Sequence, residues 1–161
     1  MTTTSVYFLR HGDAGDKRSW AGKDAGRPLS DLGIARTNAL ARHFEGTSLS
    51  PSSILTSPYA RALQTADIVA GVFGVRGSVV VDERLVPTFG TKELLCILAE
   101  DASRRILLVG HDPSFSSTIG EVIGGGAIAL RKGGLARVDF EDAAVLRGRL
   151  IWLVTPSLLG E

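Results

Sequence analysis

Short apolar runs alternate with segments of helical periodicity along most of this chain, and that alternation restricts the possible folds more than any other feature. Runs rich in branched and aliphatic residues cover residues 5–9, 52–56, 78–82 and 105–110. Helical patterns separate these runs; the third covers about 91–100, and a fourth starts near Pro113. Strands that alternate with helices form a mostly parallel sheet with helices on both faces. We therefore predict an α/β fold, a three-layer α/β/α sandwich around a mostly parallel central sheet.

The first two helical patterns carry their own start and stop signals. Ser30 is a candidate N-cap of the first helix and Gly46 its stop. Ser57 is a candidate N-cap of the second, with Pro58 at the first helical position. The stripes predicted to face the sheet are Leu32, Ala35, Ala39, Leu40 and Phe44 in the first helix, and Leu63, Ala66, Ala70 and Phe73 in the second.

The end of the chain follows a different pattern. Leu135–Phe140 and Gly148–Val154 have the composition of strands and a short connection between them, which predicts a hairpin at one side of the sheet. The sequence contains no fixed-period repeat and no linker, and its 161 residues suit one domain with a substantial core. We expect a single domain that covers residues 1–161.

Charge and composition argue against several classes of protein. The 18 Lys and Arg residues against 17 Asp and Glu residues give a net charge of +1, which is not the footprint of a nucleic-acid-binding or membrane-surface protein. The first residues lack the regions of a signal peptide, and no apolar run approaches a membrane span. Cys96 is alone, so no intrachain disulfide can form. We expect a cytoplasmic protein, and the sequence leaves its oligomeric state open.

Cationic and polar side chains follow the predicted strands where the strands end. The first strand leads into Arg10 and His11, the fourth leads into His111, and Arg61 follows the second. Ligands of open α/β sheets bind outside the carboxyl ends of the strands, so these side chains are expected to converge there. The polar segment 13–29 is long for a compact domain, and it is expected to form a lid or rim over the same site.

These residue types suit the chemistry of phosphoryl transfer. Arg10 and Arg61 offer planar donors that match phosphate geometry. A histidine attacks phosphorus only through a neutral nitrogen, and nearby guanidiniums disfavour the charged ring, so His11 is a candidate nucleophile. His111 is then expected to donate a hydrogen bond to the phosphoryl oxygens or to stabilise their charge. Gly12 is expected to relieve the sterics of the turn and to let backbone N–H groups approach the anion.

Three segments together resemble the histidine phosphatase superfamily, also called phosphoglycerate mutase-like. They are LRHGDA at 9–14, SPYARALQTA at 57–66 and VGHDP at 109–113. The RHGDA opening, and RPLS at 27–30 followed by Gly33, resemble its SixA-type phosphohistidine phosphatase branch. The resemblance implies the phosphoglycerate mutase-like fold, a covalent phosphohistidine on His11 and no metal or other cofactor. It also implies a phosphate pocket made of Arg10, Arg61 and His111, with Arg27 as a further substrate-binding residue.

One departure from the family pattern bears on the substrate. Mutase-type members carry Arg-Leu-x-Glu after the third strand, where the Glu is the general acid, whereas this chain has Arg-Leu-Val-Pro, ending at Pro87. An alkoxide is a poor leaving group without a positioned acid, whereas the P–N bond of phosphohistidine is weaker and its imidazole leaves more easily. The missing acid favours phosphohistidine or another activated phosphoryl donor.

Three other carboxylates are candidate proton donors. Asp112 follows His111 directly, although it could equally cap the helix that begins at Pro113. Asp13 and Glu83 are further candidates, and each could equally be a solvated loop residue.

We therefore predict a phosphatase that acts on phosphohistidine of a protein, such as a phosphotransfer domain in signal transduction. Alternative functions are a phosphatase of small phosphoesters or polyphosphate, and a non-catalytic phosphate-binding module. A metal hydrolase that uses His11, Asp13, His111 and Asp112 ranks low because the adjacent arginines would repel a cation.

Overall fold

The fold is known from a computed structural model, which describes residues 2–159. Its described part contains one six-stranded sheet with the strand order β3-β2-β4-β1-β5-β6. The first four strands pair in parallel, and β5 and β6 pair antiparallel at one side, as the sequence predicted. The bounds are β1 Thr4–Arg10, β2 Ser53–Thr56, β3 Val79–Val81, β4 Arg105–Gly110, β5 Leu135–Phe140 and β6 Gly148–Val154.

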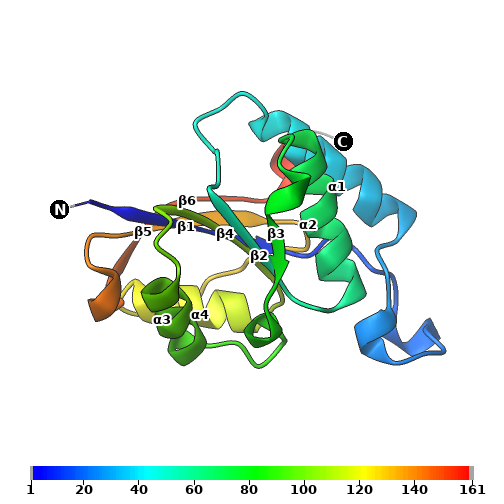
Figure 1. Cartoon of the computed structure of the whole chain (residues 1–161). Helices are drawn as coiled ribbons and strands as arrows, with labels where there is room; N and C mark the ends of the chain where they lie inside the picture. The colour runs from blue at the N-terminus through cyan, green and yellow to red at the C-terminus, as the bar shows by residue number, and fades with distance from the viewer. Residues whose placement is uncertain (1, 160–161) are drawn as a thin grey trace.

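Helices cover both faces of this sheet, which confirms the predicted three-layer α/β/α sandwich (Figure 1). Helices α1 (Asp31–Phe44) and α2 (Ala60–Val72) lie on one face. Helices α3 (Thr91–Glu100) and α4 (Ser114–Val122) lie on the other. No helix within residues 2–159 combines the length and the apolarity needed to cross a membrane.

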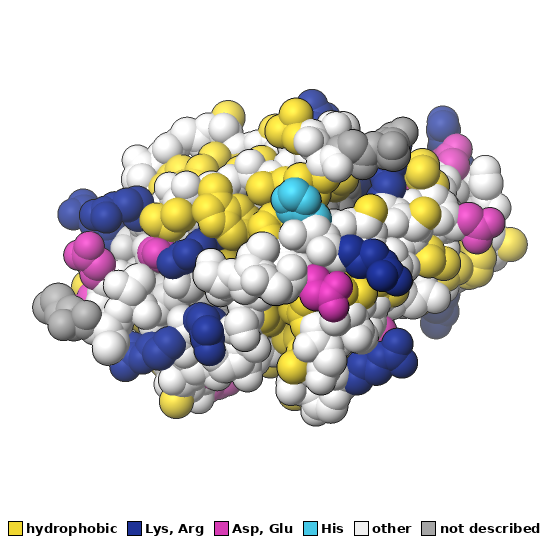
Figure 2. All heavy atoms as spheres, turned by 90° about the horizontal axis from the view of Figure 1, so that it is seen from above, with side chains coloured by type: hydrophobic (Ala, Val, Ile, Leu, Met, Phe, Trp, Pro, Cys, Tyr) yellow, Lys and Arg dark blue, Asp and Glu magenta, His cyan; other side chains and the backbone are white. Residues whose placement is uncertain are grey.

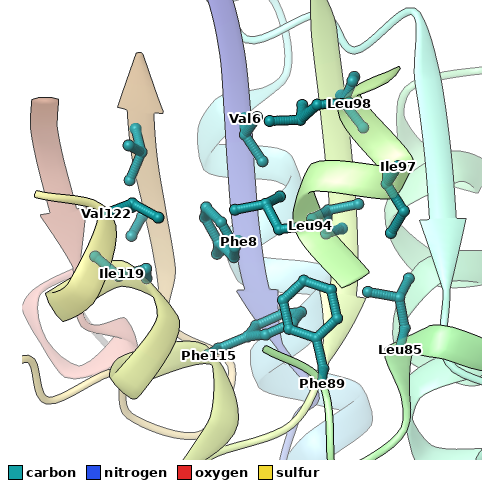
Figure 3. Close-up of a cluster of buried hydrophobic side chains, with 14 of the residues drawn as sticks. Val6, Phe8, Leu85, Phe89, Leu94, Ile97, Leu98, Phe115, Ile119 and Val122 are labelled. Carbon is teal, nitrogen blue, oxygen red and sulfur yellow. The ribbon is translucent and has the colours of Figure 1, made fainter. Parts of the chain in front are cut away.

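The central strands are buried on both faces, so alternate residues of one strand belong to two different cores. In β1, Val6 and Phe8 face α3 and α4, whereas Tyr7 and Leu9 face α1 and α2. Figure 3 shows the first of these cores, in which Phe115 of α4 lies beside Phe8. Their ring centroids are 5.3 Å apart in an edge-to-face arrangement, which fixes the start of α4 against β1.

The face that α1 presents to the sheet differs from the predicted stripe. Ser30 caps α1 as expected, because its Oγ accepts the N–H of Gly33, and Gly46 follows the helix with φ +77°. However, Leu32 is 48 % exposed. The buried positions of α1 are Gly33, Thr37, Leu40 and Ala41.

Close packing explains this rotation of α1. A Cβ on Gly33 would collide with the carbonyl of Asp13, and a Cβ on Gly12 would lie 2.8 Å from Thr37 Oγ1. The small residues of the helix therefore face the segment after β1, and the larger Leu32 lies on the outer side.

Figure 2 looks from above onto the side that α1 and α2 cover, where Lys and Arg side chains are scattered rather than gathered in one patch.

The start of α2 also differs from the prediction. The helix begins at Ala60 with Tyr59 as its N-cap, two residues beyond the expected position of Pro58. Ser57 Oγ accepts the N–H of Tyr59 in the turn before the helix and lies against the ring of His111. Ser57 is therefore a neighbour of the predicted site rather than the cap of α2.

Candidate active site

A cleft of about 350 Å³ lies at the carboxyl ends of β1 and β4 and brings together the side chains predicted from the strand ends. His11 and His111 both contribute to it, with five Lys or Arg residues and two Asp residues. The loop after β1, drawn in blue beyond the end of that strand in Figure 1, contributes several of its residues. The lining residues are Arg10, His11, Ala14, Gly15, Lys17, Asp24, Arg27, Arg61, Pro87, His111, Asp112 and Lys132.

His11 is held in one tautomer. Its Nδ1 lies 2.7 Å from the carbonyl oxygen of Gly12, and because a carbonyl can only accept, Nδ1 carries the proton. Its Nε2 accepts a hydrogen bond of 3.2 Å from Arg61 Nε, so Nε2 holds the lone pair. The pKa of His11 is lowered to about 3, mainly by burial, with smaller contributions in the same direction from His111, Arg61 and Arg10 and an opposing contribution from the hydrogen bond to Gly12. The ring is thus neutral at physiological pH, although burial rather than the predicted guanidinium charge is the main cause.

His111 is neutral as well, because burial lowers its pKa to about 4, with a smaller contribution from Arg61. Its Nε2 lies 2.8 Å from Ser57 Oγ. Ser57 Oγ accepts the N–H of Tyr59 and still carries its own hydroxyl proton; when that proton is donated to His111 Nε2, the ring proton of His111 resides on Nδ1. The rings of His11 and His111 have centroids 5.2 Å apart.

Within residues 2–159, only two buried side-chain nitrogen or oxygen atoms lack a hydrogen-bond partner, and both belong to cleft residues. They are Arg10 Nε and His111 Nδ1. The terminal Nη1 of Arg10 donates to the carbonyl of Leu130 at 3.0 Å and lies 3.9 Å from Asp112 Oδ2. A buried donor without an acceptor is costly, so these two atoms suit a ligand that brings acceptor oxygens.

Arg61 comes from the first turn of α2 rather than from a strand end, and it is 4 % exposed. Its Nη1 donates to the carbonyl of Asp24 at 2.8 Å, and its Nη2 donates to Asp24 Oδ2 at 3.1 Å. Asp24 lies in the loop 13–29, so this loop forms a rim of the cleft. Sequence reasoning missed Asp24, whose one available signal was its position three residues before Arg27.

Arg27 lines the cleft and also connects two parts of this rim through hydrogen bonds. Its Nε donates to Asp24 Oδ1 at 3.0 Å, and its Nη1 donates to the carbonyl of Ala14 at 2.8 Å. Lys17 and Lys132 add positive charge at the cleft, and the contribution of Lys132 had no signal in the sequence.

Gly12 relieves steric crowding at the turn after β1, as predicted, but its own N–H is not free for an anion. Its N–H donates to Thr65 Oγ1 at 3.2 Å rather than pointing openly at an anion. The position needs glycine because the backbone passes close to Thr37 and to the carbonyl of Gly33 in α1.

Two of the candidate proton donors are engaged in structural hydrogen bonds. Helix α4 begins at Ser114 with Pro113 as its N-cap, one residue later than the capping interpretation of Asp112 required. Asp112 still serves the helix start, because its Oδ1 accepts the N–H of Ser116 in the first turn at 3.0 Å. Asp13 accepts from Ser30 Oγ at 2.6 Å and from Lys132 Nζ at 2.9 Å. The Ser30 bond, then the Lys132 bond, lowers the pKa of Asp13 to about 2.

The third candidate, Glu83, is exposed in a short turn and is absent from the cleft lining, whereas Pro87 does line the cleft. In the described part of the chain, no three His, Cys, Asp or Glu side chains are placed to hold a metal ion.

Comparison with known proteins decides the family. The model of the histidine phosphatase superfamily (branch 1) matches residues 6–91, which include Arg10, His11, Arg27 and Arg61. The chain belongs to the histidine phosphatase superfamily. Its fold and its buried neutral histidine beside arginines agree with membership, and a phosphatase is the activity that membership supports.

Individual relatives support the SixA-type branch. The phosphohistidine phosphatase SixA of Escherichia coli (strain K12) is 25% identical over 158 residues, which cover 96% of this chain and 95% of that protein. An uncharacterized protein of Picosynechococcus sp. (strain PCC 7002) is 38% identical over 114 residues, covering 67% of this chain and 66% of that protein, just under two thirds of its length. A solved structure of the protein histidine phosphatase SixA complexed with tungstate has a TM-score of 0.85 at 24% identity, covering 97% of this chain and 99% of that chain.

Proposed function

We propose that this phosphatase removes the phosphoryl group from phosphohistidine on a protein, through a covalent phosphohistidine intermediate on His11. The observation that carries the proposal is a convergence in one cleft. The neutral Nε2 of His11 lies there with two buried donors that lack partners, Arg10 Nε and His111 Nδ1. A lone pair that attacks phosphorus and donors that receive its oxygens are what phosphoryl transfer requires of a protein.

Three side chains receive the phosphoryl oxygens. Arg10 Nε and His111 Nδ1 gain the acceptors that they lack, and Arg61 Nε moves its hydrogen bond from His11 Nε2 to an oxygen. That exchange frees the Nε2 lone pair at the moment when the phosphorus atom is in place. Ser57 acts through His111, because its hydroxyl keeps the proton of that ring on Nδ1.

In the first step, the Nε2 lone pair of His11 forms a bond to phosphorus, and the P–N bond to the substrate imidazole breaks. The substrate ring, protonated at its other nitrogen, keeps the electron pair of that bond and leaves as a neutral imidazole. His11 becomes a phosphorylated, positively charged ring whose Nδ1–H stays bound to the carbonyl of Gly12, which stabilises the charge.

In the second step, water attacks the phosphorus atom on His11. The P–N bond breaks, its electron pair returns to His11 Nε2, and the water proton leaves with the phosphate or passes to solvent. The low pKa of His11 makes its neutral form a good leaving group from phosphorus, so the intermediate hydrolyses readily.

The surroundings of the cleft support phosphohistidine over a phosphoester. Pro87 lines the wall after the third strand, where mutase-type members carry an acid. The two carboxylates of the lining already accept hydrogen bonds from other side chains. Asp24 accepts from Arg27 and Arg61, and Asp112 accepts from Ser116. A substrate imidazole that is already protonated at its other nitrogen can leave without an acid, whereas an alkoxide leaving group needs an acid to protonate it. A histidine phosphotransfer protein is the class of partner that presents such a group.

Two experiments test the proposal. Radiolabelled phosphoramidate is expected to give an acid-labile, base-stable phosphoprotein, and His11→Ala is expected to give none. A panel of a phosphohistidine peptide, aryl and alkyl phosphates and polyphosphate then separates the substrate classes. Undiminished turnover by His11→Ala would refute the mechanism, and preferential turnover of alkyl phosphates or polyphosphate would refute the substrate. Phosphate binding without turnover of any donor would indicate a binding module.

A further inference from the structure

Asp24 accepts two hydrogen bonds from Arg61, and these bonds divide the guanidinium into two edges. The two terminal nitrogens of Arg61 both donate to Asp24, Nη1 to its main-chain carbonyl at 2.8 Å and Nη2 to Oδ2 at 3.1 Å. The remaining nitrogen, Nε, points to His11 Nε2 at 3.2 Å. The terminal fork is thus turned toward the rim and Nε toward the nucleophile.

Asp24 is itself held in place. Its second carboxylate oxygen, Oδ1, accepts from Arg27 Nε at 3.0 Å. Arg27 in turn donates to the carbonyls of Ala14 and Gly15 at the opposite end of the rim. The side chains of Arg27 and Arg61 are 12 % and 5 % exposed, so both ion pairs are largely shielded from solvent.

We propose that Asp24 is a positioning residue of this phosphatase. It binds the two terminal nitrogens of Arg61, so that the Nε edge of the guanidinium faces the phosphoryl group on His11. The inference rests on the proposed function and adds to it a residue that does not touch the reacting atoms. A guanidinium has five N–H groups, and three of those on Arg61 are in use. The second N–H of Nη2 remains available beside Nε, which gives the phosphoryl oxygens two parallel donors.

The carboxylate has a second, opposing effect. Its negative charge lowers the attraction of the cleft for an anion, so removing it strengthens phosphate binding through charge. Removing it also loosens Arg61, because the bond from Nη2 to Oδ2 is lost and only the bond from Nη1 to the main-chain carbonyl remains. Three substitutions separate these effects. Asp24→Asn keeps an acceptor oxygen without the charge, Asp24→Ala removes both, and Asp24→Glu keeps the charge but displaces it by one methylene.

The test measures the rate of phosphoprotein formation from phosphoramidate in each variant, with thermal unfolding as a check on folding. Asp24→Ala is expected to lower kcat about 10- to 100-fold, as misplaced catalytic donors do, with KM changed less than threefold. Asp24→Asn is expected to retain kcat within about fivefold of the wild type because its amide oxygen still accepts from Arg61. Asp24→Glu is expected to lower kcat at least fivefold, which also keeps the test decisive if Asp24→Ala does not fold.

A matched control comes from the same loop. Asp16 also pairs with an arginine, Arg18, but both side chains are exposed and neither contacts Arg61, so Asp16→Ala is expected to leave kcat unchanged. A wild-type rate in Asp24→Ala or Asp24→Glu, or a loss in Asp24→Asn as large as in Asp24→Ala, overturns the positioning role. If the wild type itself forms no phosphoprotein, it is the proposed function that fails.

Discussion

The buried neutral state of His11 has a cost that is measurable as a pH dependence of stability. His11 has a pKa of about 3 in the folded protein, and 6.5 is the value without burial. Between these values the unfolded chain binds more protons than the folded one, so stability falls as pH falls through this window. At pH 5 the difference amounts to about 2 kcal/mol for His11 alone, from 1.36 kcal/mol per pH unit below 6.5. Replacing His11 with Asn removes this contribution.

The assay is urea unfolding of the wild type and of His11→Asn at pH 7 and pH 5. We expect the wild type to lose about 2 kcal/mol more than the variant over this interval. His111 contributes a similar loss to both proteins, because burial lowers its pKa as well. The low pKa of Asp13 affects stability only below its unperturbed value of 3.8, so it does not enter this interval. Equal pH dependence in the two proteins would refute the buried neutral state of His11.

Three further outcomes follow from the structure. Phosphoprotein formation is expected to stay constant from pH 5 to pH 8, once ionisation of the donor is allowed for, because His11 is already neutral there; an inflection near 6.5 in the rate profile contradicts this. Ser57→Ala is expected to lower kcat about tenfold in the phosphoramidate assay by releasing the tautomer of His111; an unchanged kcat contradicts it. Phe115→Ala is expected to destabilise the fold by about 3–5 kcal/mol in urea unfolding, since the ring is fully buried; a loss below 1 kcal/mol contradicts it.

Strands and helices that a short run of residue types indicates were predictable from the sequence. The strands at 105–110 and 135–140 and the helix at 91–100 have the bounds that their composition indicated. The buried face of α1 was not predictable, because it depends on how closely Gly33 can approach the chain after β1. The periodicity of apolar residues within one helix indicates which of its residues prefer burial. How closely two elements approach depends on the side chains of both, so it does not follow from the pattern of either one.

The sequence by itself determined which side chains meet at the carboxyl edge of the sheet. Arg10, His11 and His111 stand at the ends of parallel strands, and that placement follows from alternating strands and helices alone. Only the tertiary structure decided their chemical states. The tautomer of His111 depends on Ser57, and the orientation of Arg61 depends on Asp24, which is 37 residues away in the chain. Such partners are joined by folding rather than by local pattern, so their pairing with His111 and Arg61 does not follow from spacing in the sequence.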